Sequence, residues 1–272
     1  MQNSRKKEIR REANSIRENC KVNRYGIIDL FKECERMGCK LIRYPLGENA
    51  DLGFTVKKDK DTVIFTNSSS RSAREIFTLA HEIGHAILHL ENGHSFIDNK
   101  LTIMGKCITD KEQEANYFAA CLLMPENDVR RFIDIEIEEF NEKGLSALDI
   151  ARMMSEFNVS FDMTLNRLES LSIIDEKQKL CLDNEKIEKR VGNLLRSVGG
   201  NARLNLPSNE ISIPYEYIDY VIYNYNHNAV PKETLERVLA CYQLNMEDVS
   251  DKLIKPVGDD DDLETLIGGL DD

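Results

Sequence analysis

The sequence lacks any hydrophobic run long enough to cross a membrane. No stretch approaches the roughly 20 uncharged apolar residues that a spanning helix needs, so we expect a soluble protein with no membrane partner. The first 21 residues contain no apolar segment of the kind found in secretion signals. Cysteine is present without a pattern: seven residues and no CxxC pair predict reduced thiols in a cytoplasmic protein.

Charge is distributed unevenly along the 272 residues. The chain has 48 acidic and 36 basic side chains, a net charge of −12. Residues 1–25 hold eight Lys or Arg and three Glu, a balance of +5, whereas residues 258–272 hold seven acids and no base. Because phosphate repels an acidic chain, we do not expect direct DNA binding. An acidic protein is better suited to a basic protein partner, and 41% apolar residues suffice for a substantial core.

Hydrophobic periodicity predicts an α+β protein with a small sheet. The expected strands cover residues 40–44, 53–57 and 62–66. The expected helices cover residues 5–19, 27–36, 72–92, 110–124, 125–140, 146–155, 161–171 and 176–197, with a final pair after Pro231. Ser72 and Glu75 have the spacing of a capping box at the start of the third of these helices, and Gly93 is its expected stop.

The composition changes near residue 175, and we place a domain boundary there. The expected first domain covers 1–175 and includes a helical subdomain at 126–175. A mainly helical C-terminal domain of unknown role is expected at 176–257, followed by an acidic, disordered tail at 258–272. Tyrosines crowd one stretch before Pro231. Aromatic residues at helical spacing usually form a small core, so we expect one there, with a protein-contact face as the alternative.

Four of the five histidines lie within 14 residues, and two of them belong to the pattern His81-Glu82-Ile83-Gly84-His85. On a helix, positions i and i+4 lie on one face, so both imidazoles can bind one metal ion. Glu82 then lies beside the open coordination position, where it can take a proton from bound water. Gly84 costs the helix about 1 kcal/mol against Ala, which predicts a neighbour that leaves little room for a side chain.

A catalytic zinc site usually has a third protein ligand. His89 continues the i, i+4 series, but it lies two turns, about 12 Å, from His81 and cannot reach the same ion on an unbroken helix. In the helix expected at 110–124, Glu112 lies near the apolar stripe, whereas Glu114 falls roughly 120° from its centre, on the expected solvent face. A carboxylate that faces the core needs a partner or a metal. Glu112 is therefore the expected ligand, with Glu114 as its rival.

Two segments, AREIFTLAHEIGHAILH and EQEANYFAACLLMPE, closely resemble the ImmA/IrrE family of zinc metallopeptidases. The resemblance extends over about residues 20–175. It implies a zincin-like domain, with a small sheet and an active-site helix that carries HExxH. It also implies Zn²⁺ as the cofactor, His81, His85 and Glu112 as its ligands, and Glu82 as the catalytic base. The mainly α-helical C-terminal region that follows this domain is predicted by hydrophobic periodicity and not by the resemblance.

The resemblance also implies a function. We expect a cytoplasmic zinc endopeptidase that hydrolyses a peptide bond in a specific intracellular protein. The expected substrate is a helix-turn-helix transcriptional repressor, whose cleavage would relieve repression. The alternative is a non-proteolytic regulatory binding protein, which keeps the metal fold and acts by contact with a repressor or another partner. The oligomeric state is left open by the sequence.

Three further features of the sequence concern the oxyanion donor, the binding of an extended substrate and the binding of DNA. The tetrahedral oxyanion of peptide hydrolysis needs a donor besides the metal, and Tyr117 and His94 are candidates. If the strand at Thr62–Thr66 borders the cleft, an extended substrate could add to its edge. The helices around Asn158–Ser160 look like a helix-turn-helix, but the second carries only Arg167 as a base, which predicts domain packing rather than DNA reading.

Overall fold

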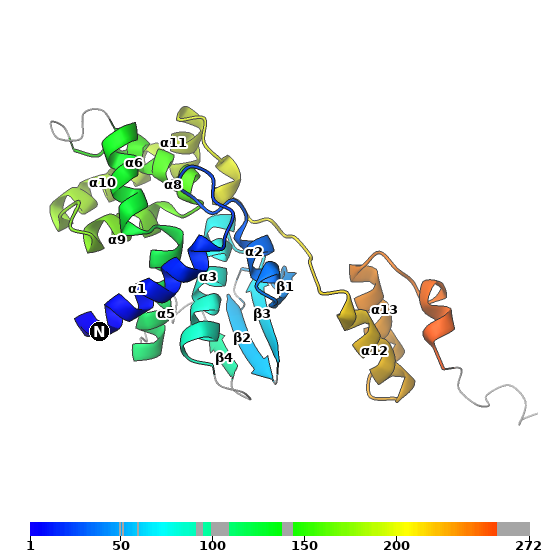
Figure 1. The fold of residues 1–272 in the computed structure, drawn as a ribbon. Coiled ribbons are helices and arrows are strands. Elements are labelled where there is room, and N and C mark those ends of the chain that lie inside the picture. The colour runs from blue at the N-terminus through cyan, green and yellow to red at the C-terminus, as the bar shows by residue number, and fades with distance from the viewer. Residues whose placement is uncertain are drawn as a thin grey trace, which may run out of the picture. The chain divides into compact units, whose positions relative to one another are not determined.

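A computed structural model of the chain describes residues 1–48, 50, 52–58, 60–90, 95–98, 109–137 and 144–254. The chain divides into two compact units, Met1–Ser212 (unit 1) and Ile213–Asp272 (unit 2). Unit 1 combines a small sheet with many helices, and the described part of unit 2 is helical (Figure 1). The predicted α+β class with a mainly helical C-terminal region is confirmed.

In the part of the chain that the structure describes, the sheet of unit 1 has four strands in the order β1-β3-β2-β4. These strands cover Lys40–Tyr44 (β1), Gly53–Lys58 (β2), Asp61–Asn67 (β3) and Ser95–Asp98 (β4). β1 is parallel to β3, whereas β2 is antiparallel to both β3 and β4. β4 lies in a segment for which the sequence predicts neither a strand nor a helix. It pairs with β2, about 40 residues earlier in the chain, a contact that local periodicity does not show.

β3 lies inside the sheet, which corrects one expectation. Its two neighbours, β1 and β2, pair with its two sides. The prediction that a substrate could add to the edge of the strand at Thr62–Thr66 is therefore wrong. Among the described strands, the outer positions belong to β1 and β4.

The helices of unit 1 begin and end close to the expected positions. They are α1 (Asn3–Glu18), α2 (Leu30–Arg36), α3 (Ser72–Leu88), α5 (Asp110–Leu123), α6 (Glu126–Glu136), α8 (Ala147–Phe157), α9 (Phe161–Ser170), α10 (Glu176–Lys189), α11 (Val191–Ser197) and the 3₁₀ helix η1 (Ala202–Asn205). The single helix expected at 176–197 is two helices, because Arg190 takes a φ of 61° between them. α3 packs against β2, β3 and α5, and α1 lies along α5 (Figure 1).

The start of α3 differs from the expected capping box. Arg71 is the N-cap and makes no capping hydrogen bond with its side chain. The backbone N–H and the hydroxyl of Ser72 both donate to the carbonyl oxygen of Leu206, at 2.8 and 2.9 Å. Glu75 is buried and accepts two hydrogen bonds from the Arg43 guanidinium, at 2.8 and 2.9 Å. The two predicted capping residues therefore bind distant segments rather than each other.

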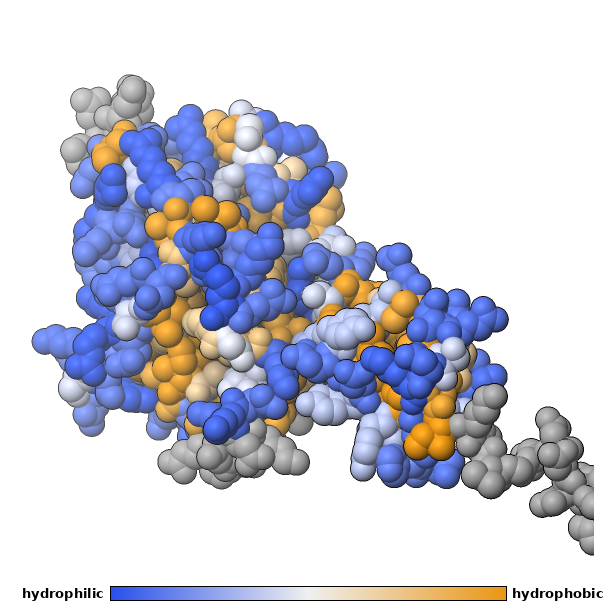
Figure 2. All heavy atoms as spheres, turned by 45° about the vertical axis from the view of Figure 1, so that its right-hand side comes forward, coloured by the Kyte–Doolittle hydropathy of each residue, from blue (hydrophilic) through white to orange (hydrophobic). Residues whose placement is uncertain are grey.

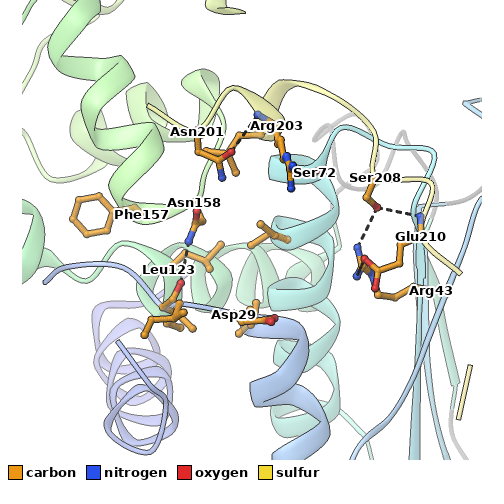
Figure 3. Close-up of a pocket in the computed structure, with 15 residues that line it drawn as sticks. Asp29, Arg43, Ser72, Leu123, Phe157, Asn158, Asn201, Arg203, Ser208 and Glu210 are labelled. Atoms are coloured by element: carbon orange, nitrogen blue, oxygen red, sulfur yellow. Dashed lines mark hydrogen bonds and ion pairs between the residues drawn. The ribbon is translucent and has the colours of Figure 1, made fainter. Parts of the chain in front are cut away.

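Residues 201–212 run along the beginning of α3 and the edge of β1. Arg43 and Ser212 exchange two backbone hydrogen bonds, at 2.7 and 3.0 Å. Ser208 donates to Glu75 and accepts from Arg43, so its side chain closes the buried ion pair. One side of a cavity of about 250 Å³ is lined by five residues of this segment: Asn201, Arg203, Leu204, Ser208 and Glu210 (Figure 3).

The compact unit therefore extends beyond the boundary that we expected near residue 175. α10 and α11 pack on α8 and α9, and three of their leucines are at most 2% exposed within the main core: Leu182, Leu194 and Leu195. The acidic tail predicted at 258–272 lies outside the described residues. Among the described helices, none combines the length and apolar character that crossing a bilayer requires.

Unit 2 contains α12 (Glu216–Asn226), α13 (Lys232–Cys241) and the 3₁₀ helix η2 (Glu247–Lys252), with Pro231 at the start of α13 as expected. Its core is aliphatic, with Ile218, Val221, Ile222, Leu235, Leu239 and Val249. Four tyrosines are 40–66% exposed, namely Tyr215, Tyr217, Tyr220 and Tyr223. The expected tyrosine core is therefore wrong, because α12 buries its aliphatic face. In each unit, the face visible in Figure 2 is mainly hydrophilic, with hydrophobic residues interspersed among the hydrophilic ones.

Candidate metal centre

α3 and α5 approach each other closely at Gly84. A Cβ atom at this position would lie 3.0 Å from Cδ1 of Phe118 and 3.3 Å from Cα of Ala115. The prediction that a neighbour of Gly84 leaves little room for a side chain is confirmed. The close approach brings Glu112, in the first turn of α5, to the histidines of α3.

Three buried side chains meet between these helices. Nε2 of His81 lies 3.0 Å from Nε2 of His85. The Glu112 carboxylate reaches both rings, with Oε2 3.2 Å from Nε2 of His81 and Oε1 3.4 Å from Nε2 of His85. The side chains of both histidines are 0% exposed and that of Glu112 is 7% exposed. This group could hold a metal ion, and it joins the three residues that the sequence predicts as ligands.

The polar contacts at Nδ1 of His81 and His85 leave the lone pair of each ring on Nε2, and the two Nε2 atoms face one another. Nδ1 of His81 lies 3.0 Å from Oδ1 of Asn116, an acceptor, so a neutral ring carries its proton on Nδ1. Nδ1 of His85 faces Nδ1 of His89 at 3.0 Å, and a proton there again leaves Nε2 as an electron-pair donor. Such donors repel one another at these distances unless a cation lies among them. Ligand atoms around tetrahedral zinc are roughly 3.3 Å apart, so the donor set fits this ion.

The carboxylate of Glu112 is held in its charged form. Burial alone would raise the pKa of this carboxyl, but the contacts with the His81 and His85 rings outweigh it and lower the pKa to about 2. Metal ligands must be deprotonated, so Glu112 is ready to bind a cation at neutral pH.

Glu82 lies between the two histidines on α3 and is fully buried. The Thr55 hydroxyl, on β2, donates to Oε2 of Glu82. β2 comes this close because Gly53 has no side chain: a Cβ there would lie 2.6 Å from Cγ2 of Thr78 and 2.9 Å from Oε1 of Glu82. The sheet therefore holds the carboxylate of Glu82 from the side opposite α5.

Glu114 is not the exposed charge that the helix periodicity predicts. Its side chain is 16% exposed, and its Oε2 accepts from Nη2 of Arg5 at 2.6 Å and lies 3.0 Å from Nε2 of His89. The reason is α1, which covers this side of α5. The hydrogen bond from Arg5 is the main cause that lowers the pKa of Glu114 to about 2.

His89 lies outside the ligand group, as its spacing from His81 predicts. It is the C-cap residue of α3 and stands behind His85. Its side chain is 4% exposed, and burial lowers the pKa of its imidazole. The ring is therefore neutral near pH 7.

The two predicted oxyanion donors remain untested. The Tyr117 hydroxyl accepts a hydrogen bond from Nη2 of Arg10 at 3.2 Å, so it faces α1. His94 lies outside the described residues. Sequence reasoning did not identify Thr55, Asn116 or Arg5 as parts of the site, because each contacts it across a long sequence separation.

Comparison with known families agrees with this geometry. The family model Peptidase M78, described as the IrrE N-terminal-like domain, matches residues 34–169, which are 136 of the 272 residues. The chain belongs to this family. The matched region begins inside α2 and ends inside α9, so it includes the sheet, α3 and α5. Comparison with curated proteins yields no match.

Membership in the M78 family implies a metallopeptidase-like domain. The buried group of His81, His85 and Glu112 could hold the metal of such a domain. α1, α10, α11 and all of unit 2 lie outside the matched residues.

Proposed function

We propose that this member of the M78 family is a zinc-dependent endopeptidase. The observation that carries the proposal is the convergence of His81, His85 and Glu112 on one point, with Glu82 between the histidines on the same helix. Three nitrogen and oxygen ligands that leave one position open are the usual set of a catalytic zinc site. Zn²⁺, when bound, lowers the pKa of a coordinated water and polarises the carbonyl of the scissile bond.

The protein side chains would then move the protons. Glu82 accepts a proton from the attacking water and delivers it to the amine of the leaving segment. The hydrogen bond from Thr55 orients the Glu82 carboxylate for both transfers. Asn116 and His89, behind the two ligand histidines, keep each Nε2 directed at the metal.

We propose a helix-turn-helix transcriptional repressor as the substrate, cleaved in the cytoplasm so that repression is relieved. The resemblance to the ImmA/IrrE family supports this class of substrate. The net charge of −12 favours a basic protein such as a DNA-binding repressor as the substrate.

The six described cysteines are free thiols, as suits a reducing compartment. We propose no direct binding of DNA by this protein. Arg167, the base in the second helix of the pair around Asn158–Ser160, is buried, and its Nε donates to the carbonyl oxygen of Met124.

The test is the Glu82→Gln variant. The amide keeps the shape of the side chain but cannot accept the proton, so we expect hydrolysis to fall at least about 100-fold. Zinc content should remain at the wild-type level, whereas a His85→Ala control should lose zinc and activity together. The inactive variant also serves as a trap: it should retain a repressor from its own cells, which the wild type then cleaves in purified form.

Two results would contradict the proposal. Undiminished hydrolysis by Glu82→Gln would exclude Glu82 as the base. If the variant relieves repression in cells as well as the wild type does, the protein acts by contact, which is the non-proteolytic alternative.

A further inference from the structure

Behind His85, a chain of polar contacts leads out of the metal centre to α1. Nδ1 of His85 is 3.0 Å from Nδ1 of His89, and Nε2 of His89 is 3.0 Å from Oε2 of Glu114. The same oxygen of Glu114 accepts from Nη2 of Arg5 at 2.6 Å. Side-chain exposure rises outward along this chain, from 0% to 4%, 16% and 30%.

The direction of each hydrogen bond follows from its end points. The carboxylate of Glu114 can only accept, so Nε2 of His89 carries the proton of a neutral ring. Nδ1 of His89 is then an acceptor, and it accepts a hydrogen bond from the N–H at Nδ1 of His85. The remaining lone pair of His85 is on Nε2, the atom that faces Glu112.

We infer that His89, Glu114 and Arg5 are positioning residues that hold His85 in the tautomer and ring orientation a metal ligand needs. The inference rests on the proposed metal site and adds a part of the chain beyond the M78 match: α1 precedes residue 34, where the match begins. Metal affinity thereby depends on the contact that Arg5 of α1 makes with Glu114 of α5. Outer partners of ligand histidines typically contribute about 10–100-fold to metal affinity.

α1 offers a matched control for this inference. Arg10 lies on the same helix, and its guanidinium contacts Glu126 at 3.2 Å and the Tyr117 hydroxyl at 3.2 Å. These contacts also anchor α1, but neither leads to a metal ligand. Removing Arg10 therefore loosens the helix without touching the chain that ends at His85.

The first experiment compares the full-length variants Arg5→Met and Arg10→Met. Zinc affinity is measured by equilibrium competition with a chromophoric chelator, and the unfolding of the metal-free proteins is followed in parallel. We expect Arg5→Met to weaken zinc binding severalfold and Arg10→Met to leave it unchanged, with similar losses of stability. Equal zinc affinities in the two variants would overturn the role of Arg5.

The second experiment compares His89→Phe with His89→Asn. Phe fills the space but offers no acceptor to Nδ1 of His85, so zinc affinity should fall about 10–100-fold. The amide oxygen of Asn restores an acceptor and should recover part of the loss. With Co²⁺ in place of zinc, the visible ligand-field spectrum should change in the Phe variant and return toward wild type in the Asn variant.

The outcomes separate this inference from the proposed function. If the wild type binds zinc and His89→Phe binds it equally well, the inference fails while the endopeptidase proposal stands. If the wild type takes up no zinc at all, both fail.

Discussion

At the residue scale, three side chains of the centre are each held by a polar contact with another residue. Asn116 contacts His81, His89 contacts His85, and Thr55 contacts Glu82. The rings and the carboxylate are thus oriented before any ligand arrives. This is the arrangement that lowers the cost of binding a metal and a substrate in one geometry.

Thr55→Val removes the hydroxyl that orients Glu82 and keeps the volume of the side chain. We expect peptide hydrolysis to fall about 10–100-fold with zinc affinity unchanged, because Thr55 touches the base and not a ligand. The matched control is Thr66→Val, since the Thr66 hydroxyl is equally buried but donates to Glu75. That control should lose stability, about 1 kcal/mol, and keep its activity per folded molecule. Full activity in Thr55→Val would contradict the assignment.

At the element scale, the distance between α3 and α5 sets the metal centre. Gly84→Ala would place a methyl group 3.0 Å from the Phe118 ring and 3.3 Å from the backbone of Ala115. Overpacking costs about 1–3 kcal/mol, against about 1 kcal/mol gained in helix propensity, so stability should change little or fall slightly. Because α5 must move away, Glu112 should bind the metal more weakly. Unfolding and zinc titration measure the two effects; unchanged zinc affinity would show that α5 tolerates the methyl group.

The ion pair between α1 and α5 should respond to acid. The pKa of Glu114 is lowered to about 2 in the folded protein, whereas an unfolded Glu has a pKa of about 4.3. A depressed carboxyl contributes stability above its unfolded pKa and loses it as the pH falls through the folded value. In metal-free protein, the wild type should therefore exceed Glu114→Gln by about 1–2 kcal/mol at pH 5, after allowance for solvent screening. Urea unfolding should show this difference shrinking toward pH 2; a constant difference would exclude the ion pair as its cause.

At the scale of the whole molecule, unit 1 is larger than the matched M78 domain. A chain that ends at Ser212 keeps Leu182, Leu194 and Leu195 in the main core, whereas a chain that ends at residue 175 loses all three. A buried leucine contributes about 1.5–3 kcal/mol, and a domain has only roughly 5–15 kcal/mol in total. We expect the longer chain to unfold cooperatively and bind zinc, and the shorter one to be several kcal/mol less stable. Equal urea midpoints and slopes for the two chains would show that α10 and α11 contribute nothing to the fold.

The sequence by itself determined what depends on local periodicity. The pattern from His81 to His85 places two imidazoles on one side of a helix wherever that helix lies, because helical geometry repeats every 3.6 residues. The apolar stripe of α5 likewise indicated Glu112. Gly84 signalled a close neighbour, though not which one.

Only the tertiary structure decided the contacts between distant segments. Glu114 lies under α1, where it binds Arg5. This partner is 109 residues away in the sequence, so local periodicity does not indicate it. Glu75 pairs with Arg43 rather than completing a capping box. β4 is a strand because β2 offers it an edge, and unit 1 ends at Ser212 because α10 and α11 find a place in its core. Periodicity shows which face of an element is buried, but the residue that covers that face is set by how the whole chain packs.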